Sequence, residues 1–304
     1  MMRWRPWLAL LGAALGDVEP GVFMVQMQAT HVARTARTTR TGRRHEVRQK
    51  PWEVHQYLAC AHHKSGVDLT KKLVWFVFGE LGVFGERGET HDLGLMTRPC
   101  GPGVCYNPEA PVRIEVDMCS AETVQQQREA AGPGVLKVVV PVRDPLEMVA
   151  SAYCFHHEWK EWYNPIAWPL GVVPSMDAQD GVAFMAHRML PQVANMSSFA
   201  EPQNDTFRID YEKFTRSSKD FDEEARKLID FWFAGLITEE EHGRVLEAAK
   251  KADLRRVPDV IGHTNSEECM SKARKATRSM PADLQSRYEE FRSRLGYNIH
   301  EDLP

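Results

Sequence analysis

The chain has 304 residues, which exceeds the usual size of one domain but suits a single α/β domain with insertions. Its 38 Lys and Arg residues are balanced by 42 Asp and Glu residues, so the formal net charge is −4. Such a chain has no overall positive field, and a nucleic acid is therefore not expected as a partner.

Residues 1–20 have the layout of a leader sequence. Arg3 and Arg5 precede an apolar core over 7–16 that ends in small residues. A core of about ten residues is typical of a secretory signal peptide and too short to span a bilayer comfortably. An organelle transit sequence and a plain apolar helix are the alternatives, and no other run is long enough for a transmembrane helix. We therefore expect the secretory pathway, as a Golgi or secreted protein, ahead of an organelle or the cytoplasm.

Residues 21–50 are predicted to be a basic linker before a folded domain over 51–304. Between 34 and 50 the chain carries seven Lys or Arg residues and a single Glu, spaced by Thr, Ala and Gly. This pattern is typical of a solvated, flexible arm. An arm that attracts an acidic glycan or nucleic acid is the alternative.

The segment 57–66 predicts a strand, a tight turn and the N-terminus of a helix. An apolar run stops at a basic turn of small residues, and apolar residues at helical spacing follow from Leu69. Backbone N–H groups and the positive end of the helix dipole make such a turn an anion site, to which Lys64 adds a mobile cation. The expected ligand contacts are Lys64, Ser65, Gly66, Val67, Asp68 and Leu69.

A long loop and two strands are expected next. Residues 82–111 are rich in Gly and Pro and are predicted to be a loop, while 112–116 is predicted to be a strand that ends at Asp117. Residues 136–142 are β-branched and almost uninterrupted, as in a strand buried on both faces.

A second anion motif follows this buried strand. Arg143 stands at the carboxyl end of the strand, Asp144 can cap the next helix, and Pro145 suits its first turn. Ser151 lies about two helical turns further along. Because open α/β sheets bind ligands at the carboxyl ends of their strands, the two motifs together imply a ligand with phosphate-like groups at both ends.

At these residues the chain resembles the sulfotransferases that use 3′-phosphoadenosine 5′-phosphosulfate (PAPS). The family's Pro-Lys-Ser-Gly-Thr turn corresponds to 63–67, and its Arg-Asp-Pro, Ser-x-Tyr and nearby His correspond to 143–145, 151–153 and His156. A weaker similarity lies at 207–214. The resemblance covers residues 55–297 by order and spacing, but only the first two motifs are specific.

The resemblance implies an α/β fold with a mostly parallel central sheet flanked by helices. It also implies transfer of a sulfuryl group from PAPS to a hydroxyl or amine of a small-molecule, glycan or lipid acceptor. Lys64 would stabilise the leaving 5′-phosphate, and Arg143 and Ser151 would hold the 3′-phosphate. No metal would be needed, because Lys and backbone amides take its place.

The sequence departs from the family in three places and leaves two other functions open. His63 and Val67 replace Pro and Thr, which removes one hydroxyl donor, and Asp68 adds a negative charge to the turn. A nucleotide kinase needs Gly-x-x-x-x-Gly-Lys-Ser/Thr, but here the order is Lys64-Ser65-Gly66. A nucleotide-binding protein of the same fold without catalytic activity is the other alternative.

The general base is the least determined residue of the predicted site. The strand between the two motifs, where many members of the family carry a His, has none. Asp117 at its end is the predicted substitute, and a loop acid or helix cap is the alternative role for this residue. Asp68, His62 and His157 are the other candidates.

The cysteines and glycan acceptor triplets bear on the compartment. Cys60, Cys119 and Cys154 are predicted to be buried thiols, because they sit in apolar patterns. Cys100 and Cys105 bracket a turn and would close as a local disulfide in a secreted protein. Two further segments, 195–197 and 204–206, match N-glycan acceptor triplets, which carry meaning only in the secretory route.

The C-terminal half holds an insertion and further helices. The insertion, 158–203, is rich in aromatic residues and Met, which predict core packing or, alternatively, an acceptor pocket. Residues 221–252 and 281–295 are predicted to be amphipathic helices. The aromatic residues of the insertion are Trp159, Trp162, Tyr163 and Trp168.

Overall fold

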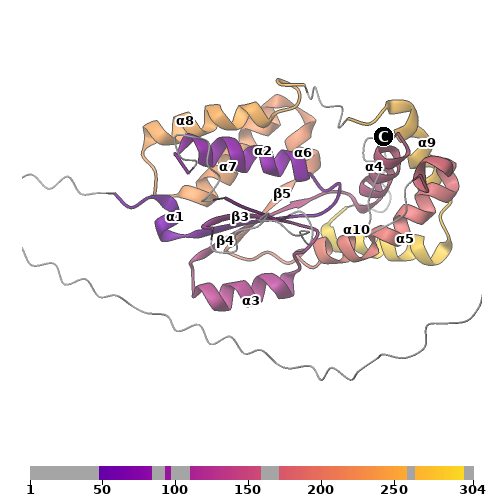
Figure 1. Ribbon diagram of the computed structural model, residues 1–304, viewed down its shortest axis with the longest axis horizontal. Helices are drawn as coiled ribbons and strands as arrows, with labels where there is room; N and C mark the ends of the chain where they lie inside the picture. Colours follow the sequence, from indigo (N-terminus) through magenta and orange to yellow (C-terminus); the bar gives the residue numbers. More distant parts are fainter. Residues whose placement is uncertain (1–47, 84–92, 97–109, 159–170, 259–263, 298–304) are drawn as a thin grey trace, which may run out of the picture. The chain divides into compact units, whose positions relative to one another are not determined.

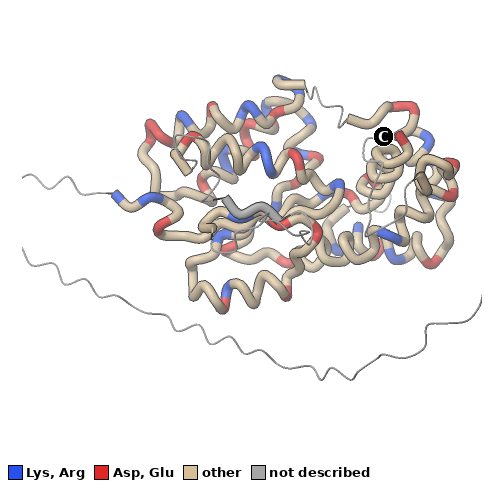
Figure 2. The backbone as a smooth tube through the Cα atoms, viewed as in Figure 1, with Lys and Arg blue, Asp and Glu red and all other residues tan. Residues whose placement is uncertain are grey.

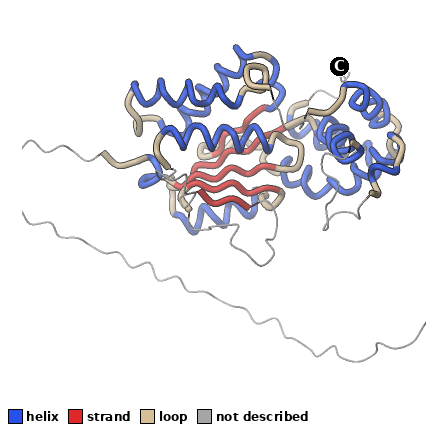
Figure 3. The backbone as a smooth tube through the Cα atoms, turned by 45° about the horizontal axis from the view of Figure 1, so that its top comes forward, coloured by secondary structure: helices blue, strands red, loops and turns tan. Residues whose placement is uncertain are grey.

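A five-stranded sheet organises the computed structural model, which describes residues 48–83, 93–96, 110–158, 171–258 and 264–297. The strand order is β2-β3-β1-β4-β5, and every neighbouring pair is parallel (Figure 3). The predicted α/β fold with a parallel sheet flanked by helices is confirmed. The strands are β1 (Gln56–Ala61), β2 (Leu93–Met96), β3 (Val112–Val116), β4 (Leu136–Val142) and β5 (Thr206–Asp210).

The side chains of the central strands alternate between two hydrophobic cores. Leu58 and Cys60 of β1 pack into one core, whereas Tyr57, Ala59 and Ala61 pack into the other. Successive side chains of a strand point to opposite faces, so a strand covered on both faces has to be apolar throughout. This explains why the neighbouring strands β1 and β4 have almost continuous apolar sequences.

Helices supply the partner surfaces of both cores (Figure 1). One core contains side chains of α2 (Val67–Glu80), α6 (Tyr211–Arg216), α7 (Ser218–Phe233), α8 (Glu239–Ala249) and the 3₁₀ turn η2 (Lys250–Ala252). The other contains side chains of α3 (Ala121–Ala131), α4 (Pro145–His157), η1 (Val173–Ser175), α5 (Ala178–Ser197), α9 (Glu267–Thr277) and α10 (Ala282–Leu295). A short helix, α1 (Pro51–Val54), precedes β1.

The strand order creates a ligand crevice beside β1. The chain leaves β1 toward β3 on one side and later returns to β4 on the other side of β1. Connections that diverge in this way leave a crevice at the carboxyl ends of the two strands, where α/β proteins bind ligands. Both predicted anion motifs follow strands that border this crevice.

Two predicted elements differ from the structure. The predicted loop over 82–111 contains β2, a short edge strand that pairs with β3 from Leu93↔Val112 to Met96↔Glu115. The predicted helix over 221–252 is interrupted between α7 and α8. Gly235 has a positive φ of 75° there, and Thr238 caps α8 by accepting from the Glu241 N–H.

The structure also corrects the assignment of three cysteines. Cys60 is joined to Cys119 and Cys154 to Cys269, so they are disulfide-bonded and not the predicted buried thiols. Their predicted burial holds, because all three are 0% exposed. The sequence pattern could not show this, since the partners are 59 and 115 residues apart.

Several predictions fall outside the described residues. They concern the leader, most of the basic linker, the Cys100–Cys105 turn and the aromatic residues over 159–170. In the described part of the insertion, Met185, Met189 and Met196 of α5 are buried in the core, as core packing predicts. No helix among the described residues is both long and apolar enough to cross a membrane.

Candidate active site

A cavity of about 730 Å³ lies at the carboxyl ends of the strands. Residues that follow β1, β3, β4 and β5 contribute to its lining, together with α2, α4, α9 and the segment after η2. The lining includes His63, Lys64, Gly66, Val67, Asp68, Leu69, Asp117, Arg143, Ser151, Phe155, Tyr211, Thr264, Asn265 and Arg274. All predicted site residues except Ser65 therefore meet at one cavity.

The charge of this cavity is opposite to that of the chain. Both signs are spread along the described backbone (Figure 2), and the chain as a whole carries −4. The described cavity lining has six cationic and four acidic side chains. The cations are Lys64, Lys71, Lys72, Arg143, Arg255 and Arg274, and the acids are Asp68, Asp117, Asp253 and Glu267. An anionic ligand is favoured here by a local balance of charge.

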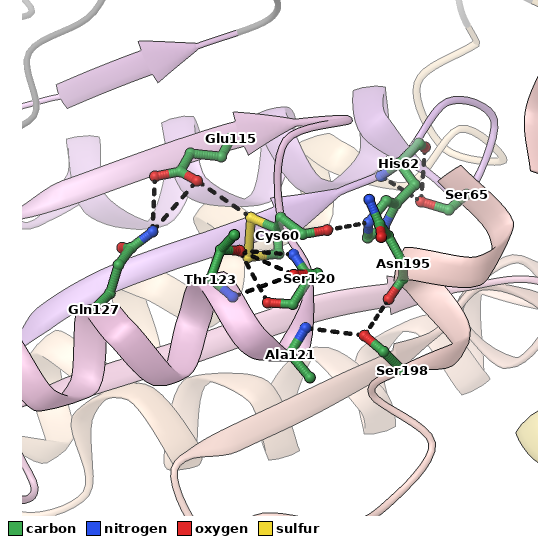
Figure 4. Close-up of a disulfide and its surroundings, with 11 residues drawn as sticks. Cys60, His62, Ser65, Glu115, Ser120, Ala121, Thr123, Gln127, Asn195 and Ser198 are labelled. Carbon is green, nitrogen blue, oxygen red and sulfur yellow. Dashed lines mark hydrogen bonds between the residues drawn. A yellow bond between two sulfur atoms is a disulfide. The ribbon is translucent and has the colours of Figure 1, made fainter. Parts of the chain in front are cut away.

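The turn after β1 is closed by the side chain of Ser65 (Figure 4). Its hydroxyl donates to the His62 carbonyl at 2.8 Å and accepts from the His62 N–H at 3.0 Å. The Ser65 N–H donates to the same carbonyl at 2.9 Å. Ser65 is 0% exposed and is not among the residues that line the cavity, so its side chain holds the turn, and its contact with a ligand stays a prediction.

The backbone of the turn requires a glycine at position 66. Gly66 has a φ of 120°, and a Cβ placed on it would lie 2.9 Å from Cδ2 of Tyr211. Only glycine adopts this conformation readily, and only glycine leaves room for the tyrosine ring. The turn can then lead directly into α2, whose first residues, Val67, Asp68 and Leu69, line the cavity with the helix N-terminus.

Lys64 and Arg143 come together from the two motifs. The Arg143 Nη1 donates to the Lys64 carbonyl at 3.1 Å, and its guanidinium lies 4.6 Å from the centre of the Tyr211 ring. The Lys64 Nζ lies 3.2 Å from the centre of the Phe155 ring of α4. Both cations thus rest on aromatic faces at the cavity wall, where such contacts stabilise a partly desolvated charge.

Ser151 of α4 lines the same cavity as Arg143. It is 7% exposed, and Asn265 Nδ2 lies 3.2 Å from its Oγ and donates to its carbonyl at 2.9 Å. Arg143 Nε is buried and has no hydrogen-bond partner among the described residues. A buried guanidinium N–H without a partner is costly unless a ligand supplies an acceptor.

A buried polar network fixes the start of α4, directly after Arg143. Asp144 caps the helix as predicted by accepting from the Leu146 N–H at 2.8 Å, and it also accepts from Arg292 Nε at 2.9 Å. Its own N–H donates to Glu212, which in turn accepts from the Tyr297 hydroxyl at 2.7 Å. Burial raises the pKa of Asp144 and of Glu212. These contacts tie the backbone next to Arg143 to α6, which directly follows β5.

Asp117, the predicted base, lines the cavity and supports the Lys64 turn. Its Oδ1 accepts from the His63 N–H at 2.6 Å, and its own N–H donates to the Ala61 carbonyl at 2.8 Å. Asp117 has a positive φ of 64°, which few residues other than glycine, Asn and Asp tolerate. The carboxylate thus lies in the same cavity as Lys64 and Arg143, while its role as base remains a prediction.

The other candidate bases differ in their access to the cavity. His62 is 0% exposed, and its Nε2 lies 3.0 Å from the Cys119 carbonyl beside the Cys60–Cys119 disulfide (Figure 4). Burial lowers its pKa to about 4. His157 stacks on Tyr153, and neither histidine lines the cavity. Asp68 does line it, as an exposed residue in the first turn of α2.

Sequence reasoning missed several residues of the cavity. His63 was noted only as a departure from the family motif, yet it lines the cavity and its Nε2 lies 3.1 Å from Nε2 of the buried His156. Asn265 and Arg274 gave no signal, because they lie more than a hundred residues beyond the motifs. Tyr211 could have been suspected from the weak similarity over 207–214.

No group of three or more His, Cys, Asp or Glu residues in the described part of the chain is arranged to hold a metal ion. No protein-family model matches the chain, and no curated protein matches it. Among solved structures, mouse sulfotransferase SULT7A1 complexed with PAP aligns with 82% of this chain and 86% of that chain. The identity is 14% and the TM-score 0.40, so this likeness says nothing of activity.

Proposed function

We propose that the protein is a sulfotransferase that moves a sulfuryl group from PAPS to a hydroxyl or amine acceptor. One observation carries this proposal: the Lys64 turn and the Arg143–Ser151 helix, 79 residues apart at their contact, line a single cavity. A ligand with two phosphate groups can engage both motifs at once. A mononucleotide with one phosphate site would leave one of them without a partner.

The residues present fit the two phosphate groups of the cofactor. The unpartnered Nε of Arg143 and the Ser151 hydroxyl offer contacts for the 3′-phosphate. On the other motif, Lys64 and the N-terminus of α2 offer contacts for the 5′-phosphate. Asp68 at that N-terminus opposes anion binding, but its side chain is exposed and can remain in water.

The catalytic roles follow from where charge changes during sulfuryl transfer. Bound PAPS supplies the sulfuryl group, and negative charge builds on the oxygen that bridges it to the 5′-phosphate. Lys64 stabilises this charge, since its ammonium sits on a flexible chain at the cavity wall. Asp117 takes the proton of the acceptor. As in phosphoryl transfer, positioning and charge stabilisation supply most of the rate, so this mechanism requires no metal.

The two disulfides support a secretory location, because such bonds persist mainly in oxidising compartments. Asn204 is exposed in the turn before β5 and suits an N-glycan, whereas Asn195 lies within α5 and its triplet ends at the buried Ser197. In that compartment, a glycan, a lipid or a secreted small molecule is the expected acceptor class.

The first experiment measures the binding of adenosine 3′,5′-bisphosphate (PAP), AMP, and ATP with and without magnesium by calorimetry. We expect PAP to bind most tightly, because it alone carries phosphate groups for both motifs. Equal or tighter binding of ATP that depends on magnesium would overturn the proposal and favour a kinase. Transfer of radiolabelled sulfate from PAPS to fractionated extract then separates an enzyme from a binding protein without activity.

A further inference from the structure

Two arginines from distant parts of the chain share one buried carboxylate at the cavity wall. Arg274 of α9 donates from Nε to Glu147 Oε1 at 2.7 Å and from Nη2 to Oε2 at 3.2 Å. Arg143 Nη2 lies 3.6 Å from the same Oε2. Both arginines line the cavity, whereas Glu147 is 8% exposed and does not. The carboxylate therefore lies behind two guanidinium groups that face the cavity.

Each guanidinium retains hydrogen-bonding capacity beyond these contacts. A guanidinium has five N–H donors. Arg143 directs one of them to the Lys64 carbonyl, and its Nε has no partner among the described residues. Arg274 uses two on Glu147 and one on Glu267 at 3.3 Å, a partner whose side chain is 84% exposed. The group formed by Arg143, Glu147 and Arg274 keeps a net positive charge and spare donors.

Helix α9 is fixed against α4 at this place. The Cys154–Cys269 disulfide joins the two helices, and Asn265 bonds to Ser151 just before α9 begins. On α4, Glu147 and Ser151 are four residues apart and lie on one face. The segment that carries Arg274 is thus held next to the two residues predicted to bind the 3′-phosphate.

We propose that Arg274 is a further anion-binding residue of the cavity and holds the same phosphate group as Arg143 and Ser151. Glu147 is a positioning residue that keeps the two guanidinium groups side by side, and the Cys154–Cys269 disulfide keeps α9 in reach. This inference rests on the proposed function, because the phosphate in question is the 3′-phosphate of PAPS. Two segments that no local motif connects would then recognise this phosphate: the Arg143–Ser151 segment and helix α9.

The test compares PAP with AMP, which lacks the 3′-phosphate, by calorimetry on the full chain. Arg274→Ala should weaken PAP binding about ten- to a hundredfold, as expected for a lost charge-assisted hydrogen bond, and change AMP binding less than about twofold. Lys272→Ala is the matched control, because Lys272 is a cation of the same helix with a 65% exposed side chain outside the cavity lining. It should leave the preference for PAP over AMP unchanged.

Arg274→Lys covers the case in which Arg274→Ala does not fold, because it keeps a positive charge beside Glu147. It should still weaken PAP binding about tenfold. An ammonium lacks the planar fork of a guanidinium and cannot contact the carboxylate and the phosphate at once. Folded Arg274 variants that keep the wild-type preference for PAP would overturn the inference. A wild-type protein that does not prefer PAP over AMP would instead refute the proposed function, whatever the Arg274 variants do.

Discussion

The two halves of the cavity, the turn around Lys64 and the wall formed by Arg143, Ser151 and Arg274, are held together by different kinds of contact. The Lys64 turn is closed mainly within itself, since Ser65 bonds to His62 three residues earlier. The Arg143 wall depends on partners far along the chain: Asn265 bonds to Ser151 across 114 residues and Arg274 to Glu147 across 127 residues. Local sequence therefore sets most of the first half, to which Asp117 adds one contact from 54 residues away, whereas the second needs the docked C-terminal helices.

A disulfide supports each half, but the two bonds act on different kinds of contact. Cys60–Cys119 joins β1 to the segment after β3, two strands that already pair through their backbones from Tyr57↔Val112 to Ala61↔Val116. Cys154–Cys269 joins α4 to α9, two helices that pack through side chains of the same hydrophobic core. The second bond should therefore matter more for the shape of the site.

Removing the disulfides should produce the largest effect. Replacing both cysteines of either pair by Ala frees a long loop in the unfolded chain and should cost about 4–5 kcal/mol of unfolding free energy in the chain-entropy view. In variants that remain folded, loss of Cys154–Cys269 should also weaken PAP binding, while loss of Cys60–Cys119 should not. Denaturant unfolding and calorimetry measure the two effects, and equal loss of PAP affinity in both variants would contradict the comparison.

Asp117→Asn should have the next largest effect, on turnover. General base catalysis contributes about 10²–10⁴-fold, so turnover of PAPS should fall within that range. Because an Asn side-chain oxygen can still accept from the His63 N–H, the turn should persist and PAP affinity should stay nearly constant. If PAP affinity falls in parallel with turnover, Asp117 serves only to hold the turn, and Asp68 becomes the candidate base.

The Lys64 half should be sensitive to acid through His62. Because burial lowers its pKa from 6.5 to about 4, the unfolded chain takes up a proton below pH 6.5 while the folded protein does not. Stability should therefore fall as pH drops from 6.5 to 4, by about 3 kcal/mol, and then level off with respect to this group. Thermal unfolding across this range should show that stability depends less on pH in His62→Gln, because a Gln side chain cannot be protonated. An unchanged dependence would mean that other groups dominate.

The smallest predicted effect separates the two cations. Lys64→Met should lower turnover about ten- to a hundredfold through the lost charge at the leaving group, with a modest change in PAP affinity. Arg143→Ala should mainly weaken PAP binding, because the proposed role of its guanidinium is to hold the 3′-phosphate, which does not react. Steady-state kinetics and calorimetry on both variants test this division. Near-normal activity in both folded variants would show that the site is assigned wrongly.

Local sequence predicted those elements whose signal lies in consecutive residues. The apolar runs of β1 and β4 and the Asp144 cap of α4 were found because burial on two faces and helix capping constrain adjacent positions. Strand β2 was missed, because four residues in a segment rich in Gly and Pro carry no periodic signal and pair only at the sheet edge.

Side-chain direction was beyond the reach of sequence reasoning. Ser65 has the residue type of a phosphate ligand, but its hydroxyl turns inward to the His62 backbone. His62 and His63 are neighbours of the same type, yet the first is buried beside a disulfide and the second lines the cavity. His63 reaches the cavity in a turn where Lys64 has a φ of 64°, and it contacts Asp117 after β3 and His156 of α4.

The sequence by itself determined the two strand-to-helix turns that carry Lys64 and Arg143, because their signals are short-range patterns of burial, capping and small residues. The parallel α/β fold was expected from the resemblance that these two turns carry. The tertiary structure alone decided the pairing of the cysteines, the burial of His62 and the arrival of Asn265 and Arg274 at the site. These depend on contacts between residues 57 to 127 positions apart. Such contacts form when helices dock and bury apolar surface. The favourable free energy of this burial comes from a whole core, so no local stretch of sequence shows which polar groups the docking brings together.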